Sequence, residues 1–136
     1  MTERIFLAVV GVAYLLLAAW CSLRPDPTSQ SVGFSLKPGS GQSEFLVVYG
    51  GLELGLGIVF LLPFYDVSWT PFALFTCLII HACLVLFRTT SFFLYSAIHT
   101  TTYVLAVVEW LIFLGALATT LLRGTWGLVN AKKWGS

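Results

Sequence analysis

Four long apolar segments alternate with short polar stretches along the chain. We expect them to form helices at about residues 3–23, 44–62, 70–87 and 100–122, because about 20 helical residues span the hydrocarbon core of a bilayer. The last apolar run begins earlier, so residues 92–99 are expected at the membrane interface. The pattern predicts one integral membrane domain over residues 1–136, with an all-α fold. We expect a polytopic, antiparallel bundle of four transmembrane helices.

Composition supports this assignment and excludes one class of partner. Hydrophobic residues make up 58% of the chain and charged residues only 10%, whereas soluble domains carry about 25% charged residues. The apolar excess must therefore face a lipid bilayer, which is the first expected partner. A net charge of +1 provides no basic field for nucleic acid, so nucleic-acid binding is excluded.

Polar and proline-containing stretches predict where the helices end. Residues 24–43 are rich in Gly, Pro and Ser and are expected to form a loop. Ser43 is the expected N-cap of the second helix, and Pro63 is expected to end it. Arg88 is expected near the end of the third helix, with its guanidinium reaching the lipid headgroups.

Four spans place both termini on one side of the membrane, and basic residues indicate which side. Cytoplasmic loops carry an excess of Lys and Arg. The side with the termini holds Arg4, Arg123, Lys132 and Lys133, and the other side holds Arg24, Lys37 and Arg88. The balance favours cytoplasmic termini and, for a bacterial protein, the inner membrane.

Ionisable residues inside the apolar segments are the main candidates for function. Glu53, His81 and Glu109 lie deep in the second, third and fourth segments, and could converge at one depth. Such groups are costly in a bilayer and indicate a functional site by default. With Tyr49 they form our candidate set for a ligand or proton site. His81 has a second interpretation, as a core histidine bonded to a carbonyl or to Glu.

Small residues flank the glutamate of the second helix. Gly50, Glu53 and Gly57 fall on one helical face, and Gly51 and Gly55 form a GxxxG pattern on an adjacent face. Small residues let another membrane helix approach closely. These glycines are therefore predicted helix-packing positions.

The fourth segment repeats this arrangement. Ala106, Glu109 and Ala116 share one face, with the acid between two small residues. We expect this face and the Glu53 face of the second helix to pack together.

The second segment also carries a recognisable motif. Residues 43–57 read SEFLVVYGGLELGLG, which resembles the signature of a family of small bacterial membrane proteins, domain of unknown function 4345. The resemblance implies a four-helix bundle with an Arg near the end of the third helix and a Glu in the last. Arg88 and Glu109 stand at similar places. The family is reminiscent of the wider DoxX-like group, and it implies no activity, cofactor or substrate.

Three functional interpretations remain open. Glu53 and Glu109 could act as structural hydrogen-bonding groups, or as proton or substrate sites of a small transporter. Glu53, His81 and Glu109 could instead form a metal or redox site, although the Glu-x-x-His motif of di-iron bundles is absent. No catalytic motif occurs, so we assign no catalytic residue, metal ligand or cofactor. We favour an accessory or assembly module that binds a lipophilic ligand, another membrane protein or a second copy of itself.

Overall fold

The computed structural model describes the backbone of residues 1–133 and the side chains of residues 1–124. Within these limits the protein consists of helices and short connections, without strands. In chain order the helices are α1 (Thr2–Leu23), α2 (Pro25–Ser31), α3 (Ser40–Phe45), the π-helix η1 (Leu46–Leu52), α4 (Glu53–Tyr65), the 3-10 helix η2 (Val67–Trp69), α5 (Thr70–Leu94) and α6 (Thr100–Lys133).

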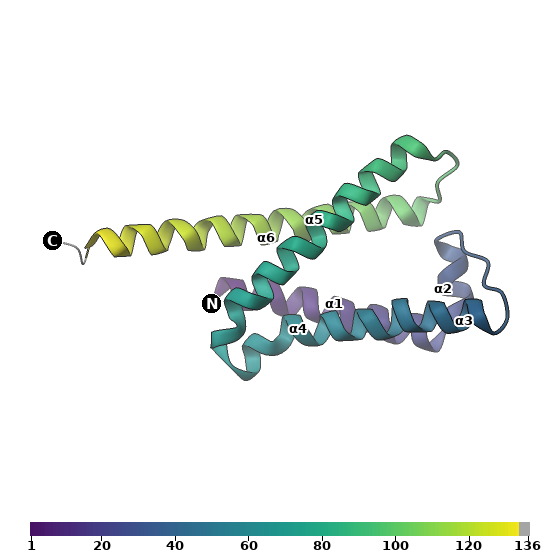
Figure 1. Ribbon diagram of the computed structural model, residues 1–136, viewed down its shortest axis with the longest axis horizontal. Helices are drawn as coiled ribbons and strands as arrows, with labels where there is room; N and C mark the ends of the chain where they lie inside the picture. The colour runs from purple at the N-terminus through teal and green to yellow at the C-terminus, as the bar shows by residue number, and fades with distance from the viewer. Residues whose placement is uncertain (134–136) are drawn as a thin grey trace.

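Four continuous helical stretches are long and apolar enough to cross a membrane. They are Thr2–Leu23, Ser40–Tyr65, Val67–Leu94 and Thr100–Gly124. Large apolar side chains cover their outer surfaces: Leu16, Val47, Phe87 and Leu111 are all more than half exposed. An outer surface of apolar side chains is stable in contact with lipid acyl chains. Successive spans run in opposite directions (Figure 1), so the predicted all-α, antiparallel four-helix architecture is confirmed.

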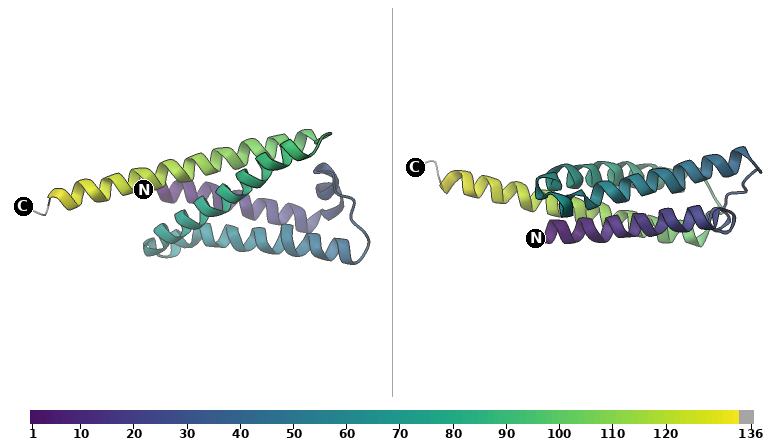
Figure 2. Two further views of the ribbon diagram at one scale, coloured as in Figure 1. Left: turned by 45° about the horizontal axis from the view of Figure 1, so that its top comes forward. Right: turned by 90° about the horizontal axis from the view of Figure 1, so that it is seen from below.

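The four spans form two pairs. The first pair is α1 with the continuous helix made by α3, η1 and α4, and the second pair is α5 with α6. α5 crosses α6 obliquely (Figure 1). In the view from below, α4 and α5 lie on one side, and α1 and α6 lie on the other (Figure 2). The start of α1 and the last turns of α6 point towards the same end of the molecule (Figure 1).

Glycines bring α1 and α4 into backbone contact. A Cβ atom added to Gly57 would lie 2.7 Å from Leu15 Cδ2 and 3.1 Å from the carbonyl oxygen of Gly11. A Cβ on Gly50 would lie 2.6 Å from Ser22 Oγ. Gly50 and Gly57 therefore pack closely against a helix, as predicted, but that helix is α1. The predicted pairing of the second helix with the fourth is wrong, because α1 occupies the glycine face.

The other predicted packing positions divide into two groups. Cβ atoms on Gly51 and Gly55 would meet no atom within 4 Å, so the GxxxG face is open on the outside of the bundle. Ala106 and Ala116 are buried, at 6% and 0% exposure. Ala116 belongs to the main core, whose members include Leu7, Val10, Phe60, Leu74 and Cys77.

The predicted loop at residues 24–43 contains helical structure. α2 starts at Pro25, because a proline in the first turn loses no intrahelical hydrogen bond and has a suitable φ. α3 starts at Ser40, four residues earlier than predicted. Gly39 adopts a φ of 79°, which glycine tolerates. Gln42 Oε1 accepts a hydrogen bond from the Gly39 N–H at 3.4 Å.

The second span continues past Pro63 to Tyr65, so the predicted end at this proline is wrong. Prolines are tolerated in membrane helices where the freed backbone groups find other partners. The Leu62 carbonyl accepts a hydrogen bond from the Asp66 N–H at 3.1 Å. Asp66 then starts η2, with its Oδ1 accepting from the Ser68 N–H at 2.9 Å. This hydrogen bond lowers the pKa of the exposed Asp66 carboxyl below its usual value.

The third and fourth spans are longer than predicted. α5 continues beyond Phe87 to Leu94. The Thr90 hydroxyl donates to the Leu86 carbonyl at 2.8 Å, and the Ser91 hydroxyl donates to the Arg88 carbonyl at 2.7 Å, so these polar side chains are satisfied within the helix. The predicted interfacial segment 92–99 is therefore divided between α5 and a connection. α6 continues past residue 122 to Lys133.

Candidate functional site

A cavity of about 270 Å³ lies between the two helix pairs. All four spans and the short helix α2 contribute to its wall. The surface of the wall is mostly apolar, and half of the lining residues have aliphatic or phenyl side chains: Ala13, Leu17, Val32, Phe45, Leu84, Leu105, Val108 and Ile112. Polar and thiol side chains complete the lining, from Tyr14, Cys21, Thr28, Tyr49, Glu53, His81, Arg88 and Glu109. The predicted candidates Tyr49, Glu53, His81 and Glu109 therefore all line one cavity.

Each span presents one face to this cavity. Residues three, four and seven apart lie on the same side of a helix. The lining follows this spacing in every span: Tyr14, Leu17 and Cys21 in α1; Phe45, Tyr49 and Glu53 in the second span; His81, Leu84 and Arg88 in α5; Leu105, Val108 and Ile112 in α6. The cavity is thus built from one face of each span, and in the second span that face includes the π-helix η1.

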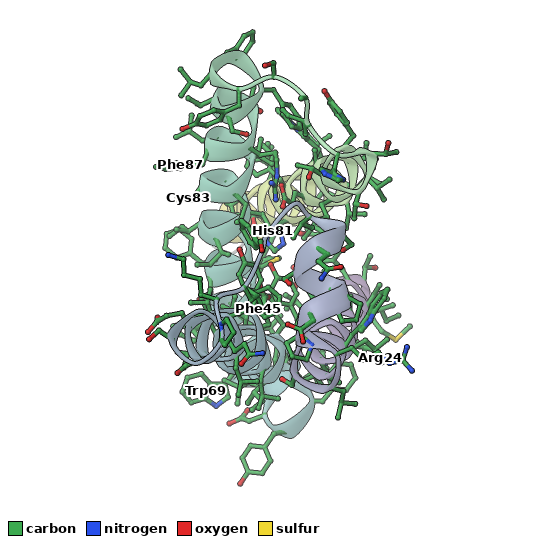
Figure 3. The ribbon with its side chains drawn as sticks, turned by 90° about the vertical axis from the view of Figure 1, so that its right-hand side faces the viewer. Arg24, Phe45, Trp69, His81, Cys83 and Phe87 are labelled. Carbon is green, nitrogen blue, oxygen red and sulfur yellow. The ribbon has the colours of Figure 1, made fainter. Side chains whose placement is uncertain are left out.

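His81 is fixed between two partners. Its ring is 1% exposed and points into the bundle, whereas Cys83 and Phe87 lie on the outer side of α5 (Figure 3). His81 Nδ1 donates to the Cys77 carbonyl oxygen at 2.8 Å, because a carbonyl only accepts. In the neutral ring Nε2 is then an acceptor, and the Tyr14 hydroxyl donates to it at 3.1 Å. The interpretation of His81 as a core histidine bonded to a carbonyl is confirmed.

Replacing Tyr14 with phenylalanine is expected to lower the free energy of unfolding by about 1–2 kcal/mol, because His81 Nε2 loses its donor inside the bundle. Tyr103→Phe is the matched control, since Tyr103 is 51% exposed and lies outside the cavity. Thermal unfolding in detergent, followed by circular dichroism, should show a lower Tm for Tyr14→Phe alone. Equal Tm values would contradict a contribution of this hydrogen bond to stability.

Arg88 and Glu109 form an ion pair with two hydrogen bonds. Arg88 Nη2 donates to Glu109 Oε1 at 2.7 Å, and Arg88 Nε donates to Oε2 at 3.0 Å. The two side chains are 28% and 14% exposed. Parallel charge-assisted hydrogen bonds of this kind are strong and specific in geometry. The expectation that Arg88 reaches the headgroups is wrong, because this pair holds its guanidinium at the cavity and joins α5 to α6.

Glu53 lies in the same cavity without such a partner. Its Oε2 atom is buried and makes no hydrogen bond with the described residues. The two glutamates thus differ in their hydrogen bonding. Both oxygens of Glu109 accept hydrogen bonds from Arg88, whereas Glu53 Oε2 has no partner among the described residues. Nearly all buried polar atoms in proteins are hydrogen-bonded, so an exception needs an explanation.

Four polar or thiol residues of the lining, Tyr14, Cys21, Thr28 and Arg88, were not predicted from the sequence, and two of them bond to predicted residues. Tyr14 carries the hydrogen bond to His81, and Arg88 pairs with Glu109. His81 and Arg88 are seven residues apart and therefore lie on one face of α5. This spacing could have predicted that Arg88 belongs to the site. Within residues 1–124, no group of three His, Cys, Asp or Glu side chains is placed to hold a metal ion.

Comparison with known protein families gives a match over most of the chain. The family described as Domain of unknown function (DUF4345) matches residues 2–122, which is most of the chain and includes all the cavity-lining residues. No curated protein matches the chain. No solved structure matches it either.

Proposed function

We propose that this chain, which belongs to the DUF4345 family, a domain of unknown function, binds a small lipophilic molecule in the cavity between its helix pairs. One observation carries the proposal: a mostly apolar cavity contains a carboxylate oxygen that has no protein partner. Small-molecule sites combine apolar walls with a few polar groups that orient the ligand. The unsatisfied oxygen of Glu53 is such a group.

The size and position of the cavity restrict the ligand. Its volume of about 270 Å³ is close to the lower limit of small-molecule sites, about 300 Å³. A compact molecule with one or two rings or a short chain suits this space. The walls are formed by membrane-spanning helices, and Thr28 and Val32 of the α2 region complete the lining. A ligand that partitions into the bilayer suits such a site best.

Transport is the second candidate function, and Glu53 is the observation that favours it. A carrier needs a group that can gain and lose a proton or a substrate. Glu53 has a free carboxylate oxygen, whereas both oxygens of Glu109 are bonded to Arg88. The transport proposal therefore rests on Glu53 and no longer needs Glu109.

We further propose a bacterial inner membrane location with cytoplasmic termini. The ion pair with Glu109 places Arg88 in the bundle, so this residue no longer counts as a loop charge. The side opposite the termini then retains Arg24 and Lys37. The larger number of basic residues on the side of the termini supports their cytoplasmic location.

Mass spectrometry of the purified protein tests ligand binding. The wild-type protein in nanodiscs is expected to retain a small molecule that organic extraction releases. Leu105→Trp should abolish this retention, because Leu105 lines the cavity and the larger side chain fills it. Leu111→Trp is the control on the same helix, since Leu111 is 64% exposed and lies outside the lining. Circular dichroism establishes that both variants remain helical.

Two results would count against the proposal. One is the absence of any bound molecule in the wild-type protein, when added lipophilic probes also fail to bind. The other is equal retention by the Leu105→Trp and Leu111→Trp variants, which would place the bound molecule outside the cavity.

A further inference from the structure

We propose that the ligand of this cavity is a lipophilic amine whose ammonium group pairs with Glu53. The inference rests on the proposed function and specifies the chemical class of the ligand. It follows from the charges, the hydrogen-bond donors and the aromatic rings that line the cavity.

The lining contains one carboxyl group without an ion-pair partner. Its charged residues are Glu53, Arg88 and Glu109. Arg88 and Glu109 neutralise each other, and both ring nitrogens of His81 are bonded to other groups, Tyr14 and the Cys77 carbonyl. Within residues 1–124, no Lys, Arg or His nitrogen lies within ion-pair distance of Glu53. A positively charged ligand would supply the missing counter-charge.

Three donor residues of the lining, Tyr14, Thr28 and Arg88, bond to groups other than Glu53. The Tyr14 hydroxyl donates to His81, and the Arg88 guanidinium donates to Glu109. The Thr28 hydroxyl donates to the Arg24 carbonyl at 2.6 Å. The Tyr49 hydroxyl does not reach Glu53 Oε2, which has no partner among the described residues. Because no lining donor reaches Glu53 Oε2, a ligand with its own donor suits this oxygen, and an ammonium group brings a donor and a positive charge together.

Aromatic rings that can attract a cation line the same cavity as Glu53. Tyr14, Phe45 and Tyr49 line the cavity, and the rings of Phe45 and Tyr49 stack with centroids 4.6 Å apart. Phe45, Tyr49 and Glu53 follow one another at intervals of four residues along the second span. Ammonium groups are attracted to the faces of aromatic rings. A carboxylate ligand would place a second acidic group beside Glu53, and the two carboxylates would repel each other whenever both are ionised.

Three probes of similar shape test the inference. They are 4-phenylbutylamine, 4-phenylbutan-1-ol and 4-phenylbutanoate, which differ mainly in the charge of their polar end. Binding to the full-length protein in nanodiscs is measured by equilibrium dialysis, with empty nanodiscs as the background. The amine is expected to bind at least about tenfold more tightly than the alcohol, which corresponds to about 1.4 kcal/mol. The carboxylate is expected to bind most weakly.

Two matched variants assign the preference to Glu53. Glu53→Gln should bring the Kd of the amine to that of the alcohol and leave alcohol binding unchanged. Glu44→Gln removes the same charge from an exposed residue nine positions earlier in the same span, and it should retain the amine preference. If Glu53→Gln does not fold, the ratio of amine to alcohol affinity in the wild-type protein still decides the question.

The outcomes separate this inference from the proposed function. Equal binding of amine and alcohol to the wild-type protein, blocked by Leu105→Trp, would overturn the amine and keep a lipophilic ligand. An amine preference that persists in Glu53→Gln would overturn the role of Glu53. Failure of all three probes to bind above the empty nanodiscs would overturn both proposals.

Discussion

Replacing Arg88 with alanine is expected to lower the free energy of unfolding by about 3 kcal/mol. The substitution leaves Glu109, which is 14% exposed, without its partner inside a bundle of apolar helices. An uncompensated buried charge accounts for most of such a loss, because the attraction within a buried pair only roughly repays the desolvation of its members. Equilibrium unfolding in mixed detergent micelles, followed by circular dichroism, measures this change.

A double variant and a second ion pair provide the controls. Arg88→Leu combined with Glu109→Leu removes both charges and should recover stability to within about 1 kcal/mol of the wild-type protein. Arg123→Ala removes an exposed contact to Glu3 at 3.4 Å, and it should cost at most about 1 kcal/mol. If Arg88→Ala and Arg123→Ala have equally small effects, the Arg88–Glu109 pair is unimportant for folding.

Replacing Gly57 with valine is expected to destabilise the protein by about 3 kcal/mol, at the upper end of overpacking costs. The new Cβ would lie 2.7 Å from Leu15 Cδ2 and 3.1 Å from the Gly11 carbonyl oxygen. Leu15 can change rotamer, but the Gly11 backbone can move only with the whole of α1. The substitution therefore separates α1 from α4. Thermal unfolding in detergent should show a large decrease in Tm.

Gly55→Val is the matched control two residues earlier in the same helix. A Cβ on Gly55 would meet no atom within 4 Å, so this variant carries the same change in helix propensity without the steric conflict. Its Tm should stay close to that of the wild-type protein. A loss in Gly55→Val equal to that in Gly57→Val would show that the open glycine face also contacts another chain or that the helix itself needs glycine.

The four spans could be predicted from sequence because their cause is local. An apolar segment of sufficient length has to form a helix in a bilayer, whatever its neighbours are. The ends of the helices were predicted less well, since Thr90 and Ser91 satisfy their hydroxyls on the carbonyls of α5 and do not end the helix. The glycine pattern predicted close packing, but a pattern on one helix does not specify its partner.

Some residues of the site could be predicted because their signal is also local to one segment. Glu53, His81 and Glu109 stand out because charged or polar side chains are rare within apolar segments. The difference between the two glutamates was not predictable. Whether Arg88 extends to the headgroups or turns towards Glu109 depends on the crossing of α5 and α6, and the sequence does not contain that angle.

The π-helix η1 determines how the second span presents its side chains. In an α-helix, each step of four residues turns the side-chain direction by about 40°, so Phe45 would point about 80° away from Glu53. The wider turns of a π-helix rotate the chain less per residue and offset this drift. Phe45, Tyr49 and Glu53 consequently lie in line along the cavity wall. The number of residues between Phe45 and Glu53 thus matters as much as which residues stand at these two positions. Deletion of one residue between them would turn Phe45 away from the face of the helix that carries the Glu53 carboxylate.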